Sequence, residues 1–131
     1  MTPKFKAKIK AAINKLRRQW PPIIAVKKAA RVGPELFRCS GCNMLIYAGA
    51  RDISYIHIHH PEAVEGKVDV DHSDPVQPVD GRELTFDEYI DRVFCEEDNL
   101  KLLCKICHVS KSAVEASERA EFRKKKKVRD L

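Results

Sequence analysis

The sequence predicts a small α+β fold built around a four-cysteine metal site. Two CxxC pairs, Cys39 with Cys42 and Cys104 with Cys107, are separated by 61 residues. Short apolar runs of strand-like composition flank both pairs, and segments with apolar residues at helical spacing lie near both ends of the chain and before the second pair. A chain of 131 residues suits one domain and is short enough for a structural metal to matter to its stability.

The N-terminal segment, residues 4–20, predicts a basic amphipathic helix. Lysine and arginine cover most of this helix, and one stripe is apolar, consisting of Phe5, Ile9, Ala12, Ile13, Leu16 and Trp20. Pro3 suits the first turn, and the prolines at 21 and 22 stop the helix. Residues 23–31 predict a second short helix that ends at Gly33 and Pro34. The stripe suits packing onto the domain as well as it suits a membrane surface, and membrane binding is the less favoured interpretation.

The first cysteine pair predicts a zinc knuckle at the tip of a hairpin. Residues 36–38 lead into the pair, residues 44–47 leave it, and Gly41 is expected to let the backbone turn tightly around the metal. The alternating residues 52–60 predict a strand with His57 and His59 on one face, and the role of His60 is left open. Because no third ligand is evident nearby, a solvated or hydrogen-bonded face is preferred to a further metal site.

The central part of the chain predicts a second strand and a long loop. Residues 67–71 have strand-like composition; Asp71 ends this strand and His72 follows directly. The next ten residues, 73–82, contain two prolines and a glycine and predict a surface loop.

Two further helices are predicted after this loop. Thr85 begins the first of them, with Glu88 completing a capping box. Cys95 follows this helix as the fifth, unpaired cysteine and is interpreted as a small buried apolar residue. The last helix is predicted from about residue 105 to beyond residue 123, with the lysine run 124–127 fraying from its end.

Charge is distributed unevenly along the chain. Residues 1–31 contain ten Lys/Arg and no Asp/Glu, residues 32–118 contain eight basic and 17 acidic residues, and residues 119–131 contain seven basic and two acidic residues. This pattern suits a metal-binding centre held against a polyanion by basic arms, with merely solvated helices as the alternative. The predicted organisation is a basic helical arm (1–34), a central domain with a structural zinc (35–118) and a basic tail (119–131).

The N-terminus has positive charge without the continuous apolar segment of a signal peptide, and no apolar run approaches the length of a membrane span. An intracellular, cytoplasmic protein is therefore expected. Thiols stay reduced in that compartment, and paired CxxC units favour zinc over disulfides.

The candidate ligands predict two metal sites of different kinds. Four thiolates suit a closed tetrahedral zinc site, which holds chain segments together and leaves no coordination position open. Asp71 and His108 would leave most of a metal shell to water and phosphate oxygens, as a catalytic Mg²⁺ or Mn²⁺ requires. The imidazole of His72 suits a general base for water attacking a phosphodiester. On an extended strand Asp71 and His72 point to opposite faces, so they converge only if the chain bends, as residues 73–75 make plausible.

These residues carry a family resemblance. Residues 71–76, followed by residues 99–108 and Lys111, resemble the signature of HNH endonucleases with its two flanking CxxC pairs, and the signature letters fall on His72, Asn99 and His108. The resemblance covers residues 36–112, although the 28 residues between Cys42 and Asp71 exceed the spacing of many short members. The basic helices and lysine-rich tail are less specifically similar to those of small HNH proteins encoded in tailed-phage genomes.

The resemblance implies a ββα-metal (His-Me finger) core and a DNA endonuclease. In such a core His72 is the general base, Asp71 and His108 hold a Mg²⁺, Mn²⁺ or similar ion, and Asn99 braces the loop around His72 or joins the metal shell. The implied reaction leaves a 5′ phosphate and a 3′ hydroxyl. The implied partners are DNA and phage packaging proteins, in a bacterial or phage-infected cell. The alternative is a noncatalytic zinc-containing DNA-binding or phage-assembly scaffold protein. Nicking versus double-strand cleavage, sequence specificity and oligomeric state are left open.

Overall fold

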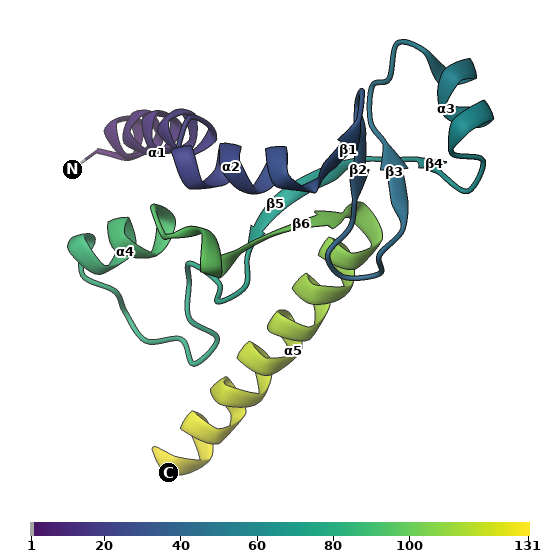
Figure 1. Cartoon of the computed structure of the whole chain (residues 1–131). Coiled ribbons are helices and arrows are strands. Elements are labelled where there is room, and N and C mark those ends of the chain that lie inside the picture. The colour runs from purple at the N-terminus through teal and green to yellow at the C-terminus, as the bar shows by residue number, and fades with distance from the viewer. Residues whose placement is uncertain (1) are drawn as a thin grey trace.

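The computed structural model describes residues 2–131 as a mixed α+β protein with two small sheets (Figure 1). Two helices open the chain, α1 (Pro3–Arg18) and α2 (Pro21–Ala30), each with proline in its first turn. No residue of α1 is buried, so the predicted apolar stripe does not pack along its length. The arm is instead anchored by Trp20, whose Nε1 donates a hydrogen bond of 2.7 Å to the carbonyl of Cys95 and whose ring meets Phe94 edge-on.

The first sheet has four strands in the order β1-β2-β3-β4. They are β1 (Arg31–Gly33), β2 (Leu36–Arg38), β3 (Leu45–Tyr47) and β4 (Val64–Glu65). The hairpin predicted around the first cysteine pair is present as antiparallel β2 and β3. Helix α2 stops at Ala30, one residue before the predicted end, because residues 31–33 pair with β2. The division predicted at residue 34 falls in the turn between β1 and β2.

Residues 53–59 are helical, so the strand predicted over residues 52–60 is wrong. They form α3 (Ile53–His59), which Asp52 caps by accepting a hydrogen bond of 3.0 Å from the backbone N–H of Tyr55. Ile56 is 2% exposed and packs with Leu36, Leu45 and Ala63. It is the one buried residue of this helix, whereas a strand would bury alternate residues.

The histidines of α3 therefore do not share a face as predicted. His57 lies beside Tyr47, with 3.5 Å between its Nε2 and the Tyr47 hydroxyl, whereas the ring of His59 packs on Tyr55. His60 lies 4.0 Å from a carboxylate oxygen of Glu62. Each histidine thus has a local neighbour of its own.

The second sheet is an antiparallel pair that leads directly into the longest helix. Strand β5 (Val68–His72) pairs with β6 (Leu100–Cys104), and α5 (Lys105–Arg129) follows β6 without a loop. Helix α2 packs on this pair, and α5 projects away from it toward the C-terminus (Figure 1). Helix α5 includes the lysine run that was expected to fray, and the division predicted at residue 118 falls inside it.

The segment between β5 and β6 contains the predicted loop and helix. Residues 73–85 have no regular structure, and α4 (Phe86–Val93) begins with the predicted capping box of Thr85 and Glu88. A single 3-10 turn, η1 (Glu97–Asn99), leads into β6. None of the helices in residues 2–131 combines the length and the apolar character that a bilayer crossing requires.

Candidate metal centre and adjoining polar site

The four predicted cysteines lie together at the corner between β6 and α5. Their sulfur atoms all lie within 4.8 Å of one another, and the Sγ atoms of Cys42 and Cys104 are 3.9 Å apart. Four sulfurs bound at about 2.3 Å to one tetrahedral ion lie about 3.8 Å apart, so the spacing fits a metal such as zinc. All five cysteines are free thiols. The predicted four-cysteine cluster is confirmed.

The backbone around the first pair is shaped for this cluster. Ser40 donates its backbone N–H to the carbonyl of Leu102 (2.9 Å), which joins the turn to β6. The left-handed conformation in the turn belongs to Asn43 (φ 65°) and not to Gly41. Gly41 is needed for space, because a Cβ there would lie 3.0 Å from the sulfur of Cys107. Gly41 was expected to be required for the conformation of a tight turn. Glycine is instead required there because a side chain would crowd the sulfur of Cys107.

The thiols of the cluster differ in pKa, and a bound cation would favour the deprotonated form of all four. Burial alone would raise the pKa of the Cys39 thiol, but backbone N–H groups, including those of Cys104 and Gly41 at 3.3 Å, lower it to about 6. Hydrogen bonding with the sulfurs of Cys104 and Cys39 raises the pKa of Cys107 to about 12. Four thiolates at this spacing therefore require a positive ion among them, which is the chemistry of a closed zinc site.

A second group of polar side chains lies on the face of β5 that meets α5. The nearest nitrogen–oxygen distance between His108 and Asp71 is 3.7 Å (Nε2 to Oδ1), and between His108 and Asp69 it is 3.6 Å (Nδ1 to Oδ2). The structure therefore places Asp71 and His108 side by side. Both distances exceed a hydrogen bond, so neither carboxylate satisfies the imidazole.

Lys111 lies one turn further along α5 and joins this group. Its Nζ contacts a carboxylate oxygen of Glu115 at 2.6 Å, the backbone carbonyl of His72 at 2.8 Å and Oδ2 of Asp71 at 2.8 Å. The contact with Asp71 is an ion pair without hydrogen-bond geometry, so that buried oxygen has no hydrogen bond. Partial burial opposes the charge of Lys111, but the carboxylates of Asp71 and Glu115 outweigh it and raise its pKa.

His72 lies on the other side of β5. The ladder of β5 and β6 continues through Asp71 and His72, which pair with Lys101 and Leu100, so their side chains point to opposite faces. The bend that was expected to bring them together begins only after His72. The ring is 7% exposed, and its Nε2 lies 2.9 Å from the carbonyl of Val93 at the end of α4.

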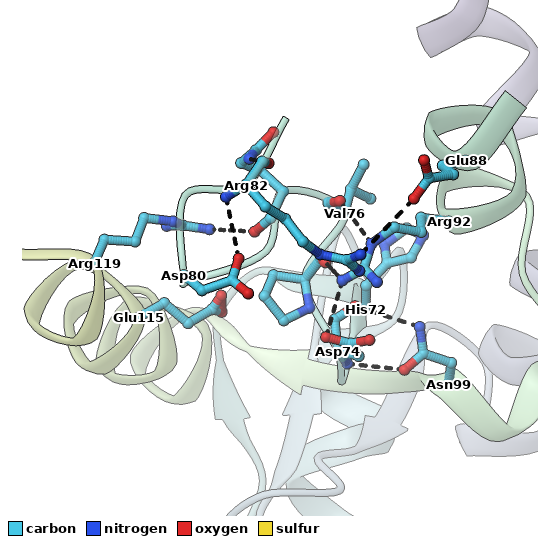
Figure 2. Close-up of polar contacts among 12 residues, drawn as sticks. His72, Asp74, Val76, Asp80, Arg82, Glu88, Arg92, Asn99, Glu115 and Arg119 are labelled. Atoms are coloured by element: carbon cyan, nitrogen blue, oxygen red, sulfur yellow. Dashed lines mark hydrogen bonds and ion pairs between the residues drawn. The ribbon is translucent and has the colours of Figure 1, made fainter. Parts of the chain in front are cut away.

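Asn99 holds the chain directly after His72. Its backbone carbonyl accepts from the N–H of Ser73 (2.8 Å), and its side-chain oxygen accepts from the N–H of Asp74 (2.8 Å). Figure 2 shows Asn99 and Arg92 on either side of Asp74; Arg92 binds the Asp74 carboxylate at 3.0 Å and the Val76 carbonyl at 2.9 Å. The loop is therefore fixed where it leaves β5.

The sequence interpretation missed several members of these groups. Lys111 was noted only as the end of a signature, although its spacing of four residues from Glu115 is the usual signal of an ion pair on a helix. Asp69 shares a face with Asp71 by strand alternation and was detectable in the same way. The contact between His72 and Val93 joins distant segments and had no local signal.

Cys95 is only partly buried, whereas burial was predicted. Desolvation raises the pKa of its thiol, which makes it a poor nucleophile. Comparisons with models of known protein families, with curated proteins and with solved structures found no match for this chain.

Proposed function

We propose that this protein is a metal-dependent DNA endonuclease of the HNH kind. The observation that carries the proposal is the juxtaposition of Asp71 and His108, 3.7 Å apart, where β5, β6 and α5 meet beside the four-cysteine cluster. Two strands and a helix that present a carboxylate and an imidazole to one point are the elements that a ββα-metal site needs. The four-cysteine cluster serves as the structural site and the Asp71–His108 pair as the reactive one.

The donor pair fits a hard divalent cation. Two donors bound to one Mg²⁺ at about 2.1 Å can lie at most about 4.2 Å apart, which the observed separation satisfies. Lys111 pairs with Oδ2 of Asp71, so Oδ1, the oxygen that faces His108, is left for a cation. When bound, such an ion would neutralise charge that grows on the phosphate and on the departing 3′ oxygen. Asp71 and His108 would hold it.

His72 is suited to take the proton of the attacking water. A carbonyl can only accept a hydrogen bond, so the contact with Val93 requires the proton of the neutral ring to reside on Nε2. Nδ1 then carries the free lone pair and serves as the general base. Water oxygen bonds to phosphorus, its proton passes to Nδ1, the bond from phosphorus to the 3′ oxygen breaks, and that oxygen takes up a proton from a solvent water. The products are a 5′ phosphate and a 3′ hydroxyl.

The position of the phosphate follows from the two faces of β5. The side chains of His72 and Asp71 lie on opposite faces of β5, so one phosphate can reach both only at the end of the strand. The scissile phosphate is therefore placed there. Ser73 begins the loop there, and Asn99 fixes that loop through two backbone N–H groups. Asn99 is therefore a positioning residue in this proposal.

DNA is the favoured polyanion because basic residues approach this site from the arm. Arg17, Arg18 and Lys27 line a groove of about 380 Å³ that Asp69 of β5 also borders. The lysine-rich end of α5 supplies further exposed cations. Contacts of this kind mostly reach phosphates and favour affinity that depends on salt and little on sequence.

A noncatalytic zinc-containing DNA-binding protein is the second candidate. Two observations favour it: His72 is buried on the face away from Asp71, and Lys111 already neutralises Asp71. In this alternative the cysteine cluster and basic arms suffice, and the polar groups of β5 and α5 only stabilise the corner. The arms bind DNA in both cases, so affinity alone does not separate them.

Cleavage of supercoiled plasmid with and without Mg²⁺ or Mn²⁺ separates the two. The wild-type protein is expected to nick or linearise the plasmid only with the metal. His72→Ala is expected to lose cleavage while keeping zinc content and DNA affinity, with a lower melting temperature because the buried ring and its bond to Val93 are lost. Cys95→Ala is the matched control outside the site. A wild-type protein that binds plasmid but never cleaves it refutes the nuclease, and cleavage that survives His72→Ala refutes the base.

A further inference from the structure

A cavity of about 320 Å³ adjoins the candidate metal pair. It lies between the first CxxC turn and the β5–β6 pair, and α5 forms another wall. Its polar lining consists of Ser40, Asp71, Ser73, Lys101 and Lys111. The cavity therefore contains one carboxylate, two hydroxyl groups and two ammonium groups around the end of β5.

The two lysines of this cavity differ in what they contact. Lys111 donates hydrogen bonds to Glu115 and to the His72 carbonyl and forms an ion pair with Asp71, so its charge is already committed. Lys101 is exposed and forms no ion pair or side-chain hydrogen bond with any residue in the described range 2–131. Lys101 is thus the uncommitted cation of the cavity.

The register of the sheet fixes Lys101 beside the reactive group. Lys101 of β6 is the direct cross-strand partner of Asp71, so both side chains emerge on the same face. A phosphodiester carries a negative charge and would be repelled by the carboxylates of Asp71 and Glu115, which share the single ammonium group of Lys111. A cation directly opposite Asp71 offsets that repulsion and supplies a hydrogen-bond donor.

We propose that Lys101 binds a nonbridging phosphate oxygen of a DNA strand in this cavity. The hydroxyl groups of Ser40 and Ser73 are further donors to the same phosphate. The proposal rests on the proposed nuclease function and adds a substrate-binding residue that touches the reacting phosphodiester. Lys101 is distinct from the basic arms, because it acts at one phosphate next to Asp71 and not along the duplex.

Lys101→Met tests the proposal, since methionine keeps an unbranched stem without the charge. Lys105→Met is the matched control: Lys105 is also exposed, but it borders a different, mainly apolar cavity lined by Met44 and Ile46. Lys101→Arg tests rescue by another cation. Zinc content and melting temperature are measured for all three variants.

Two readouts are taken on the full-length, zinc-loaded protein. The first is kcat/KM for plasmid cleavage in Mn²⁺, which is expected to fall at least tenfold in Lys101→Met and to recover largely in Lys101→Arg. The second is binding of a labelled duplex at several salt concentrations without added divalent ion. Loss of one phosphate contact lowers the slope of log affinity against log salt by about 0.9.

The outcomes distinguish this inference from the function on which it rests. If wild type cleaves but Lys101→Met matches Lys105→Met in both readouts, the inference is overturned and the nuclease stands. If wild type fails to cleave in any divalent ion, the nuclease is overturned and the salt slope decides the phosphate contact. An unchanged slope for Lys101→Met then overturns the inference as well, and a slope reduced only in that variant supports it.

Discussion

Gly41→Ala would place a methyl group against the cysteine cluster. The new Cβ would lie 3.0 Å from the sulfur of Cys107, 3.3 Å from its Cβ and 3.4 Å from a methyl carbon of Leu103. The sulfur cannot retreat without leaving the other three, and Leu103 is 6% exposed. Overpacking of this kind typically costs about 1–3 kcal/mol. Because metal binding in such sites is coupled to folding, zinc affinity should fall by about 5-fold to 150-fold.

The affinity is measured by competition with a chromophoric zinc chelator, and thermal melting is followed in parallel. Gly33→Ala is the matched control, because a Cβ at Gly33 would lie at an ordinary 3.7 Å from Leu36. That variant should stay within about 0.5 kcal/mol of wild type. Equal zinc affinity and equal melting temperature in the two variants would refute the close-packing explanation of Gly41.

Three further predictions concern the cluster, the loop and the tail. Cys104→Ser should lose zinc and the cooperative melting transition, and a normal melt without metal would contradict the four-cysteine site. Asn99→Ala should cost about 0.5–1.5 kcal/mol in melting experiments and lower kcat well beyond that loss of stability, whereas unchanged kcat would leave Asn99 a purely structural residue. Truncation after Arg119, which keeps the 2.8 Å bond of Arg119 to the Gln77 carbonyl, should weaken DNA binding and flatten its salt dependence. An unchanged slope would make the tail a solvated end.

Local chemistry explains which parts of the fold could be predicted. The CxxC spacing identified the metal cluster, because two sulfurs separated by one tight turn approach a common point whatever surrounds them. The capping box of Thr85 and Glu88 likewise depends only on neighbouring backbone and is present as predicted. The N-terminal helix followed from its flanking prolines and the apolar spacing of residues 4–20. Each of these signals lies within a few residues of the feature that it predicts.

The segment 52–60 shows why other parts could not be predicted. Its alternating residues have the composition of a strand, yet Asp52 caps a helix and Ile56 supplies the one buried contact with the first sheet. A tertiary contact with Leu36 and Leu45 decides between the two conformations, and no pattern within the segment records it. The extension of α5 through the lysine run has no comparable contact that explains it.

The candidate site was predictable in its residues but not in its arrangement. Asp71 and His108 were expected together and lie 3.7 Å apart. Whether His72 joined them depended on the point at which β5 bends, and pairing with Leu100 keeps the strand extended through His72. Val93 then fixes the imidazole on the other face. The pairing of β5 with β6 therefore determines which face the His72 side chain occupies. Its position next to Asp71 in the sequence does not reveal this.

The cysteine cluster also explains how His108 reaches Asp71. Successive residues on an α-helix are separated by about 100° around its axis, so Cys107 can face the cluster while His108 faces β5. Cys104 and Cys107 bracket the corner where β6 becomes α5, and a bound metal fixes the direction of the helix at its first turn. Lys111 and Glu115 continue the same face along the next two turns. Because the far end of α5 projects beyond the strands (Figure 1), its direction depends on this first turn and on the contacts of Lys111 and Arg119. A zinc ion here would control the separation of Asp71 and His108 without touching any substrate.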